Sequence, residues 1–94
     1  MTNFTVRIEL NNPKDEDYED LHEKMENAKF KKTIKSSDGV IYKLPDAEYD
    51  YSSSTETTED VLDKAYDIAK SVRSGPRVLV TESNGRMWRG LKKA

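Results

Sequence analysis

His22 is the only histidine of the chain, and its side chain is the one best suited to proton transfer at neutral pH. An imidazole titrates near pH 6.5, so it serves as a general acid or base, for instance toward a ribose 2′-hydroxyl. In the helix predicted around it, His22 lies beside Leu21 and away from the centre of the apolar stripe. The alternative interpretation is a solvated histidine on a charged helix.

Metal or cofactor chemistry has a weaker basis in the sequence. Glu9, Asn11 and Asn12 offer oxygen ligands at the end of the first predicted strand, but Asn12 suits a helix cap equally well. The acidic runs at 15–26 and 46–63 have no ordered ligand spacing and indicate solvated helix faces. No P-loop, GxSxG, HExxH or GxGxxG pattern is present. We expect no metal and no cofactor.

The elements that position these residues follow from the hydrophobic periods. Apolar and polar residues alternate over 4–10, which predicts a half-buried strand. Helical spacing predicts a first helix over 13–28, with Asn12 as its N-cap. A second helix is predicted to begin after Thr57, with Asp60 completing a capping box.

Two hairpins complete the pattern. The strands 30–35 and 40–44 are joined by a three-residue loop with Gly39 in the left-handed conformation, which sets Ile34 opposite Tyr42. Asn84-Gly85 predicts a second hairpin, between strands 78–83 and 86–91. Its register sets Val80 opposite Arg89 and Thr81 opposite Trp88.

The order strand, helix, hairpin, helix, hairpin predicts an α+β fold. We expect one ferredoxin-like βαββαβ domain over 1–94, an antiparallel sheet with two helices on one face and an extra C-terminal strand. The other sheet face would be left uncovered by helices.

We expect this uncovered face to be basic. Cations beside a large aromatic side chain suit single-stranded RNA, because Lys and Arg contact phosphates and a base stacks on the aromatic ring. The residues expected to contact RNA are Arg7, Lys31, Lys35, Lys43, Arg77, Arg86 and Trp88.

A non-enzymatic interaction module is the alternative function. Ile41, Leu79 and Trp88 would then pack against a second copy, giving a homodimer through the sheet face or through an edge strand. Lysines on the strand 30–35 are also an ordinary defence against edge-to-edge aggregation.

Composition limits the class of protein. The chain is 34% hydrophobic and 36% charged, with a net charge of −2, which argues against a protein that coats nucleic acid without specificity. The absence of cysteine excludes disulfides and Cys-based zinc sites. No apolar run is long enough for a signal peptide or a membrane span, so we expect a cytoplasmic protein without a membrane partner.

Several short segments resemble a known family, the small bacterial proteins grouped with GhoS, the endoribonuclease antitoxin of type V toxin–antitoxin systems. The segments that carry the resemblance are Phe4-Thr5-Val6-Arg7-Ile8-Glu9-Leu10, Tyr18, Leu21-His22, Met25, Phe30, Tyr42-Lys43-Leu44-Pro45, Ala47-Glu48-Tyr49 and Leu79-Val80-Thr81-Glu82-Ser83. They are spread over most of the chain.

The resemblance implies a ferredoxin-like fold similar to the CRISPR-associated Cas2 proteins and metal-independent cleavage of a toxin's messenger RNA. An arginine in the first helix is implicated in GhoS, and setting Phe30 against the family's phenylalanine after that helix brings His22 to the same position. The aspartate that Cas2 proteins carry near the end of the first strand is absent here, where Glu9 and Asn11 are nearest.

Overall fold

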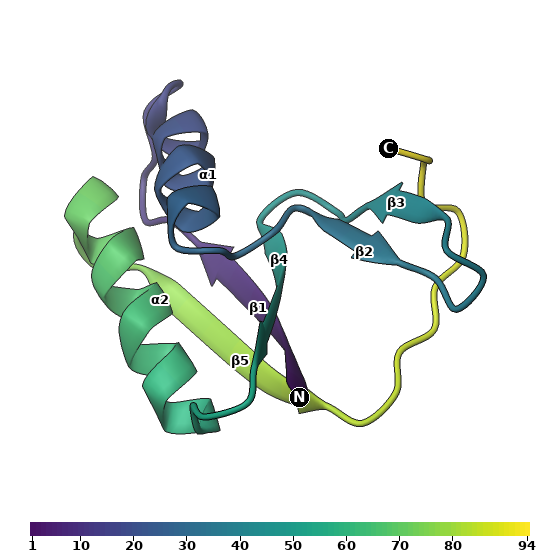
Figure 1. Ribbon diagram of the computed structural model, residues 1–94. Helices are drawn as coiled ribbons and strands as arrows, with labels where there is room; N and C mark the ends of the chain where they lie inside the picture. The colour runs from purple at the N-terminus through teal and green to yellow at the C-terminus, as the bar shows by residue number, and fades with distance from the viewer.

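The computed structural model describes residues 1–94. Two helices lie on one side of a three-stranded antiparallel sheet, and a small two-stranded sheet extends from it (Figure 1). This is the expected α+β fold, consistent with a ferredoxin-like arrangement. The elements in chain order are β1 (Thr2–Glu9), α1 (Asp17–Asn27), β2 (Thr33–Lys35), β3 (Ile41–Lys43), β4 (Glu48–Ser53), α2 (Thr58–Val72) and β5 (Arg77–Ser83).

The main sheet has the order β4-β1-β5, with the first strand at its centre. Val6 lies opposite Tyr49 on one side and opposite Val80 on the other. The chain just before β2 joins the outer edge of β4 through a single bridge between Lys31 and Asp50. Their main chains exchange two hydrogen bonds of 2.8 Å.

Beyond Lys31, the strands β2 and β3 leave the main sheet and form a separate hairpin, called the arm here. Ile34 pairs with Tyr42, as predicted, and Gly39 closes the turn at φ +88°. Pro45 and the positive φ of Ala47 (+68°) interrupt the chain between β3 and β4. As a result β4, and not β3, lies beside β1.

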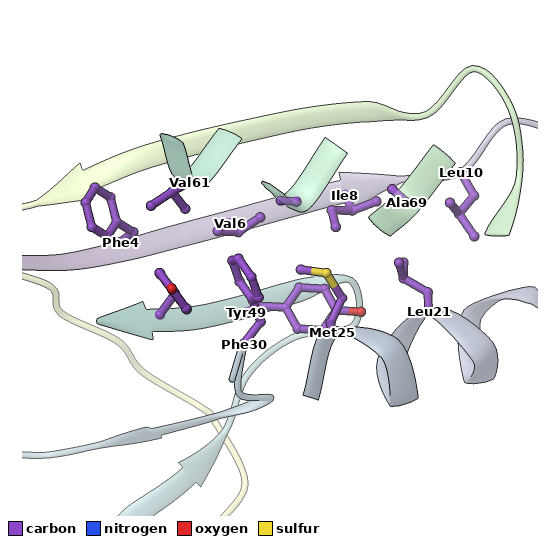
Figure 2. Packing of buried hydrophobic residues seen from close by; sticks show 12 residues of the cluster. Phe4, Val6, Ile8, Leu10, Leu21, Met25, Phe30, Tyr49, Val61 and Ala69 are labelled. Atoms are coloured by element: carbon purple, nitrogen blue, oxygen red, sulfur yellow. The ribbon is translucent and has the colours of Figure 1, made fainter. Parts of the chain in front are cut away.

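The core lies between the main sheet and the two helices (Figure 2). The predicted alternation in β1 directs every second side chain toward the helices, and the stripes of α1 and α2 cover them. Phe30 and Tyr51 stack with their ring centroids 4.2 Å apart, which ties β4 to the start of the arm. The core residues are Phe4, Val6, Ile8, Leu10, Leu21, Met25, Phe30, Tyr49, Tyr51, Val61, Ala65 and Ala69.

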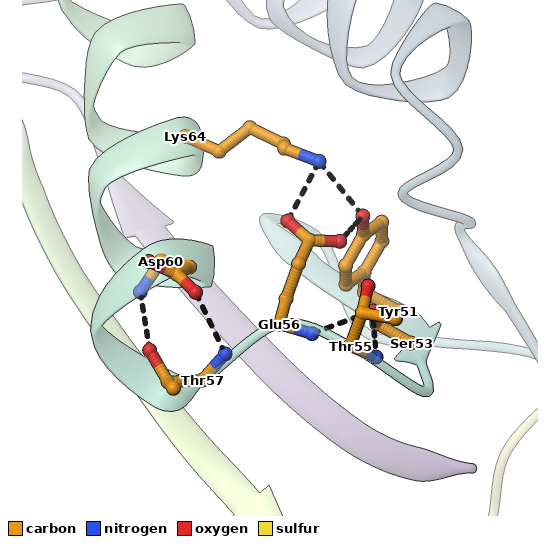
Figure 3. Close-up of polar contacts among 7 residues, drawn as sticks. All are labelled: Tyr51, Ser53, Thr55, Glu56, Thr57, Asp60 and Lys64. Atoms are coloured by element: carbon orange, nitrogen blue, oxygen red, sulfur yellow. Dashed lines mark hydrogen bonds and ion pairs between the residues drawn. The ribbon is translucent and has the colours of Figure 1, made fainter.

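The predicted capping box of α2 is confirmed (Figure 3). Thr57 Oγ1 accepts a hydrogen bond from the main-chain N–H of Asp60 (3.1 Å), and Asp60 Oδ2 accepts one from the N–H of Thr57 (3.0 Å). Beside it, the ammonium of Lys64 lies 2.8 Å from Glu56 Oε2 and 2.8 Å from Tyr51 Oη. These contacts attach the first turns of α2 to β4.

The predicted start of α1 at residue 13 is wrong, because the helix begins at Asp17. Asn12 adopts a positive φ of +48° and does not cap the helix. The carboxylate of Asp17 instead accepts a hydrogen bond from the N–H of Lys14 (2.7 Å) and lies 3.5 Å from Arg73. This carboxylate closes a turn before the helix and links it to the end of α2.

The predicted hairpin at Asn84-Gly85 is also wrong. No strand follows β5, and residues 84–94, called the tail here, cross from the main sheet to the arm (Figure 1). The N–H of Lys43 donates to the carbonyl of Lys92 (2.8 Å), and the N–H of Ala94 donates to the carbonyl of Ile41 (2.9 Å). The tail therefore runs beside β3, and the packing of Trp88 against Tyr42 takes the place of a strand pairing with β5.

Neither helix is long and apolar enough to cross a membrane. The longer of the two, α2, has 15 residues, fewer than the about 20 apolar residues that a spanning helix needs.

Candidate nucleic-acid interface

The side chains of His22 and Tyr49 are hydrogen-bonded across the layer between α1 and β4. Tyr49 Oη lies 2.5 Å from His22 Nδ1, and the two ring centroids are 5.7 Å apart. Tyr49 is fully buried, whereas His22 is half-buried at the surface above it. The contact holds Nδ1 in place and leaves Nε2 as the ring nitrogen available to another molecule.

Lys32 is held beside this pair by the turn that precedes β4. Its Nζ donates hydrogen bonds to the carbonyls of Pro45 (3.0 Å) and Glu48 (3.4 Å). The same ammonium lies 5.2 Å from the ring centroid of Tyr49, within reach of a cation–π contact. A positive charge is thus fixed next to the histidine.

Burial and charge set the protonation of the three groups. Burial lowers the pKa of His22 below its ordinary value, and the Lys32 ammonium lowers it further, while Asp46 and Glu19 act in the opposite direction. Burial also lowers the pKa of Lys32 and raises the pKa of Tyr49. At neutral pH the imidazole is therefore neutral and the phenol keeps its proton. When Nδ1–H donates to Tyr49 Oη, the free Nε2 is able to accept a proton.

A cleft of about 520 Å³ lies where the tail meets the arm. Trp88 of the tail contacts Tyr42 of β3 edge to face, with centroids 5.7 Å apart and the rings at 64°. Lys35, Arg86 and Met87 also line this cleft. Trp88 further lines a second cleft of about 320 Å³, which extends to Pro45. One partly exposed indole is thus accessible from two hollows.

Arg86 anchors the tail to the uncovered face of the main sheet. Its Nη1 lies 2.7 Å from Asp50 Oδ1 and 3.5 Å from Thr5 Oγ1. The side chains of Arg86 and Asp50 are only 23% and 18% exposed, so the ion pair is largely shielded from solvent. Its charge is neutralised within the chain, and its main role here is to position Trp88.

The structure gathers some of the predicted RNA contacts and separates others. Lys35, Arg86 and Trp88 line one cleft. Lys31 is exposed beside Asp50. Lys43 lies opposite Thr33, on the face of the arm that it shares with Lys35 and that points away from Tyr42, and it lines neither cleft at Trp88.

Arg7 and Arg77 lie elsewhere, toward the far end of the uncovered face, where Arg77 pairs with Glu9 at 2.5 Å. The expected basic sheet face is therefore of mixed charge. Because β4 and not β3 lies beside β1, that face also carries Glu48 and Asp50. The basic side chains concentrate instead on the arm, the chain leading into it, and the tail. They are Lys29, Lys31, Lys32, Lys35, Lys43, Arg86, Arg89, Lys92 and Lys93.

Tyr49, Lys32, Tyr42 and Asp50 were not predicted to take part in the site. The alternation of Tyr49 with Tyr51 in the sequence indicates only that the two side chains share one face of a strand. Nothing in the sequence shows that the turn at Pro45 brings Lys32 and Tyr49 together, because that contact depends on the break between β3 and β4. No group of three or more His, Asp or Glu side chains is gathered as a metal site.

Comparison of the chain with protein-family models, with curated proteins and with solved structures found no match, so the residues and their geometry carry the functional argument.

Proposed function

We propose that this protein binds single-stranded RNA at the junction of the tail and the arm and cleaves it without a metal ion, as the resemblance to the GhoS antitoxins implies. The observation that carries the proposal is the half-exposed Trp88, which lines two clefts among basic side chains. Every nucleobase has a π face, so an indole in this setting binds RNA with little sequence preference.

The charge distribution supports this site. Lys31, Lys35 and the tail lysines Lys92 and Lys93 are exposed, and they are free to contact phosphates near a base stacked on Trp88. The acidic first turn of α2 lies away from the tail and the arm, whereas the acidic first turn of α1 lies near His22, where Glu19 acts on the pKa of the imidazole. A near-neutral chain thereby has one surface that attracts RNA and another that repels it.

The His22–Tyr49 pair supports the cleavage step. His22 Nε2 would take the proton of a ribose 2′-hydroxyl, and the 2′-oxygen would then attack the adjacent phosphorus. The bond to the 5′-oxygen breaks, that oxygen takes a proton from water, and the products are a 2′,3′-cyclic phosphate and a 5′-hydroxyl. Lys32 supplies positive charge beside the reacting phosphate.

The turn at Pro45–Glu48 connects the two parts of the proposed site. Its carbonyls accept the hydrogen bonds of Lys32, while the side chains of Pro45 and Glu48 line the smaller cleft at Trp88. A strand of RNA that passes over this turn would place one base at Trp88 and a phosphate near His22. On this proposal the protein acts in the cytoplasm, and its substrate would be a toxin's messenger RNA.

Titration of Trp88 fluorescence with short single-stranded RNA tests the binding. It is the only tryptophan, so the signal comes from the proposed site alone. We expect quenching at low salt that weakens steeply as salt rises, because phosphate contacts release counterions. Lys31→Glu with Lys35→Glu should abolish the quenching. The charge-matched control is Lys24→Glu with Lys70→Glu, on the exposed helix surfaces, and it should retain binding. Equal RNA affinity in the two double variants would contradict the assignment.

Cleavage is tested with the same RNA, labelled at its 5′ end, in buffer containing a chelator. Wild-type protein should release a fragment that ends in a 2′,3′-cyclic phosphate, and His22→Ala should lose about 100-fold or more of the rate. Full activity of His22→Ala would remove His22 from the mechanism while leaving the binding site intact.

Self-association is a second candidate function, and the exposure of Leu79 on an edge strand favours it. Leu79 is 63% exposed on β5, which has only one neighbour in the main sheet. Apolar association persists at high salt, whereas RNA binding does not, so the two activities are separable in the same titration.

A further inference from the structure

Strand β5 forms an open edge of the main sheet, since β1 is its only neighbour. The N–H of Ile8 donates to the carbonyl of Ala47, on the β4 side of β1. Hydrogen bonding alternates along a strand, so the main-chain groups of Thr5 and Arg7 point to the other side, toward β5. Leu79 lies opposite Arg7, so the main-chain N–H and C=O of Leu79 bond to β1. The main-chain groups of its neighbours, Val78 and Val80, consequently point out of the sheet.

This edge lacks the usual protection against strand pairing. It contains no lysine, no proline and no break over seven residues, and its middle is the apolar run Val78-Leu79-Val80. A groove of about 480 Å³ runs along it between α2 and β5, and Leu62 forms part of its wall. By contrast, the outer edge of β4 is occupied by the bridge to Lys31.

We propose that β5 pairs antiparallel with β5 of a second copy, about a two-fold axis that passes beside Leu79. In this register Leu79 faces Leu79 of the second copy, and Val78 faces Val80 of the second copy. The outward groups of Val78 and Val80 then exchange main-chain hydrogen bonds in both directions. The three-stranded sheets of the two copies become one continuous six-stranded sheet.

The sequence of β5 selects this register. A shift by one residue would turn apolar side chains to opposite faces. A shift by two would set the carboxylate of Glu82 opposite Val78, whereas the proposed register sets Arg77 opposite Thr81 and leaves no like charges facing each other. The second copy is thus a complementary partner for this strand because the apolar run is nearly symmetric about Leu79.

The helices give the dimer a salt dependence opposite to that of RNA binding. Glu59 and Asp63 lie at the groove beside β5, and both copies would bring them to the same side of the joined sheet. Their repulsion is screened by salt, so we expect the dimer to strengthen between low and physiological ionic strength.

Disulfide trapping tests the register directly, because the chain contains no cysteine. Leu79 would form a non-hydrogen-bonded pair with its copy at a Cα distance of about 4.5 Å, within the range that a disulfide spans. Leu79→Cys should therefore give a covalent dimer under a mild oxidant. Thr81→Cys lies on the same face but would be separated from its copy by four residues, or about 13 Å, and should form no covalent dimer. Equal crosslinking of both variants, or of neither, would overturn the register.

Sedimentation of the unmodified chain tests the association itself. We expect the mass of two chains at high protein concentration and a shift to monomer for Leu79→Lys. Ile41→Lys is the matched control, because Ile41 is also an exposed apolar residue (48%) but lies on the arm. The Ile41→Lys variant should still dimerise. A wild-type chain that is monomeric at every concentration and salt would refute the proposal without affecting RNA binding at Trp88.

Discussion

Tyr49 Oη lies 2.5 Å from His22 Nδ1, so the only histidine of the chain is fixed by a phenol that is itself fully buried. A side chain held in this way has lost its rotational freedom, and only Nε2 remains for chemistry. The pair also explains why a polar hydroxyl is tolerated in the core, since a buried donor or acceptor without a partner is costly. The contact is therefore structural as well as a means of positioning the imidazole.

Replacing Lys32 by glutamine should raise the pKa of His22. The Lys32 ammonium is the second cause of the lowered pKa, after burial, and glutamine removes its charge while keeping similar length. NMR titration of the single imidazole measures this pKa directly. Lys35→Gln is the control, because this exposed lysine lies on the arm and does not contribute to the pKa of His22. No difference between the two variants would argue against the proposed proximity of Lys32.

The stability of the protein should fall as the pH is lowered below about 6.5. Because the pKa of His22 is lowered on folding, the unfolded chain binds a proton there more readily than the folded chain does. The stabilisation that comes from the neutral imidazole is complete above the pKa that His22 has in the unfolded chain. It is lost as the pH falls through the lower pKa that His22 has in the folded protein. Urea unfolding between pH 7 and pH 5 measures it, and His22→Gln should show a shallower dependence. Identical slopes would contradict the assignment.

The parts of the fold that depend on local signals were predictable from the sequence. The stripe of Leu21 and Met25, the capping box at Thr57 and the register around Gly39 each arise from residues a few positions apart. The tail was mispredicted because Asn84-Gly85 is a strong local hairpin signal. The interaction that overrides this signal is non-local, because Trp88 packs on Tyr42, which lies far back in the sequence. Hydrophobic periodicity does not predict a contact of that kind.

The candidate site also combines residues that the sequence identifies with contacts that it does not predict. His22 was identifiable from its chemistry alone, whereas its partner Tyr49 is 27 residues away. Proline does not continue a central strand, so Pro45 marks an interruption, but the consequence of that interruption for the order of the strands could not be read from the sequence. After the interruption β4 takes the place beside β1, which brings Asp50 onto a face that was expected to be basic. The tail then anchors there through Arg86.

Replacing Asp50 by asparagine should loosen the tail. The substitution leaves the half-buried Arg86 without its carboxylate, at a cost of about 1 kcal/mol for a partly shielded pair. We expect the emission of Trp88 to shift to longer wavelength and its quenching by acrylamide to increase. Glu9→Gln removes the far more exposed pair with Arg77, at side-chain exposures of 63% and 69%, and should leave the emission unchanged. A similar shift in both variants would indicate a general loss of structure.

Replacing Thr57 by alanine should destabilise the whole domain by about 1 kcal/mol, because the first turn of α2 loses one half of its capping box. For a domain of this size, that corresponds to a decrease in Tm of about 4–8 °C. The adjacent Glu56–Lys64–Tyr51 contacts remain in the variant (Figure 3), so the helix should shorten at its start and stay attached to β4. Thermal unfolding followed by circular dichroism measures the change. Thr55→Ala is the control, since Thr55 contributes only its main-chain N–H to Ser53, and its change in stability should stay within about 0.5 kcal/mol, or about 2–4 °C in Tm. An equal loss in both variants would show that the loop before α2, and not the cap, limits stability.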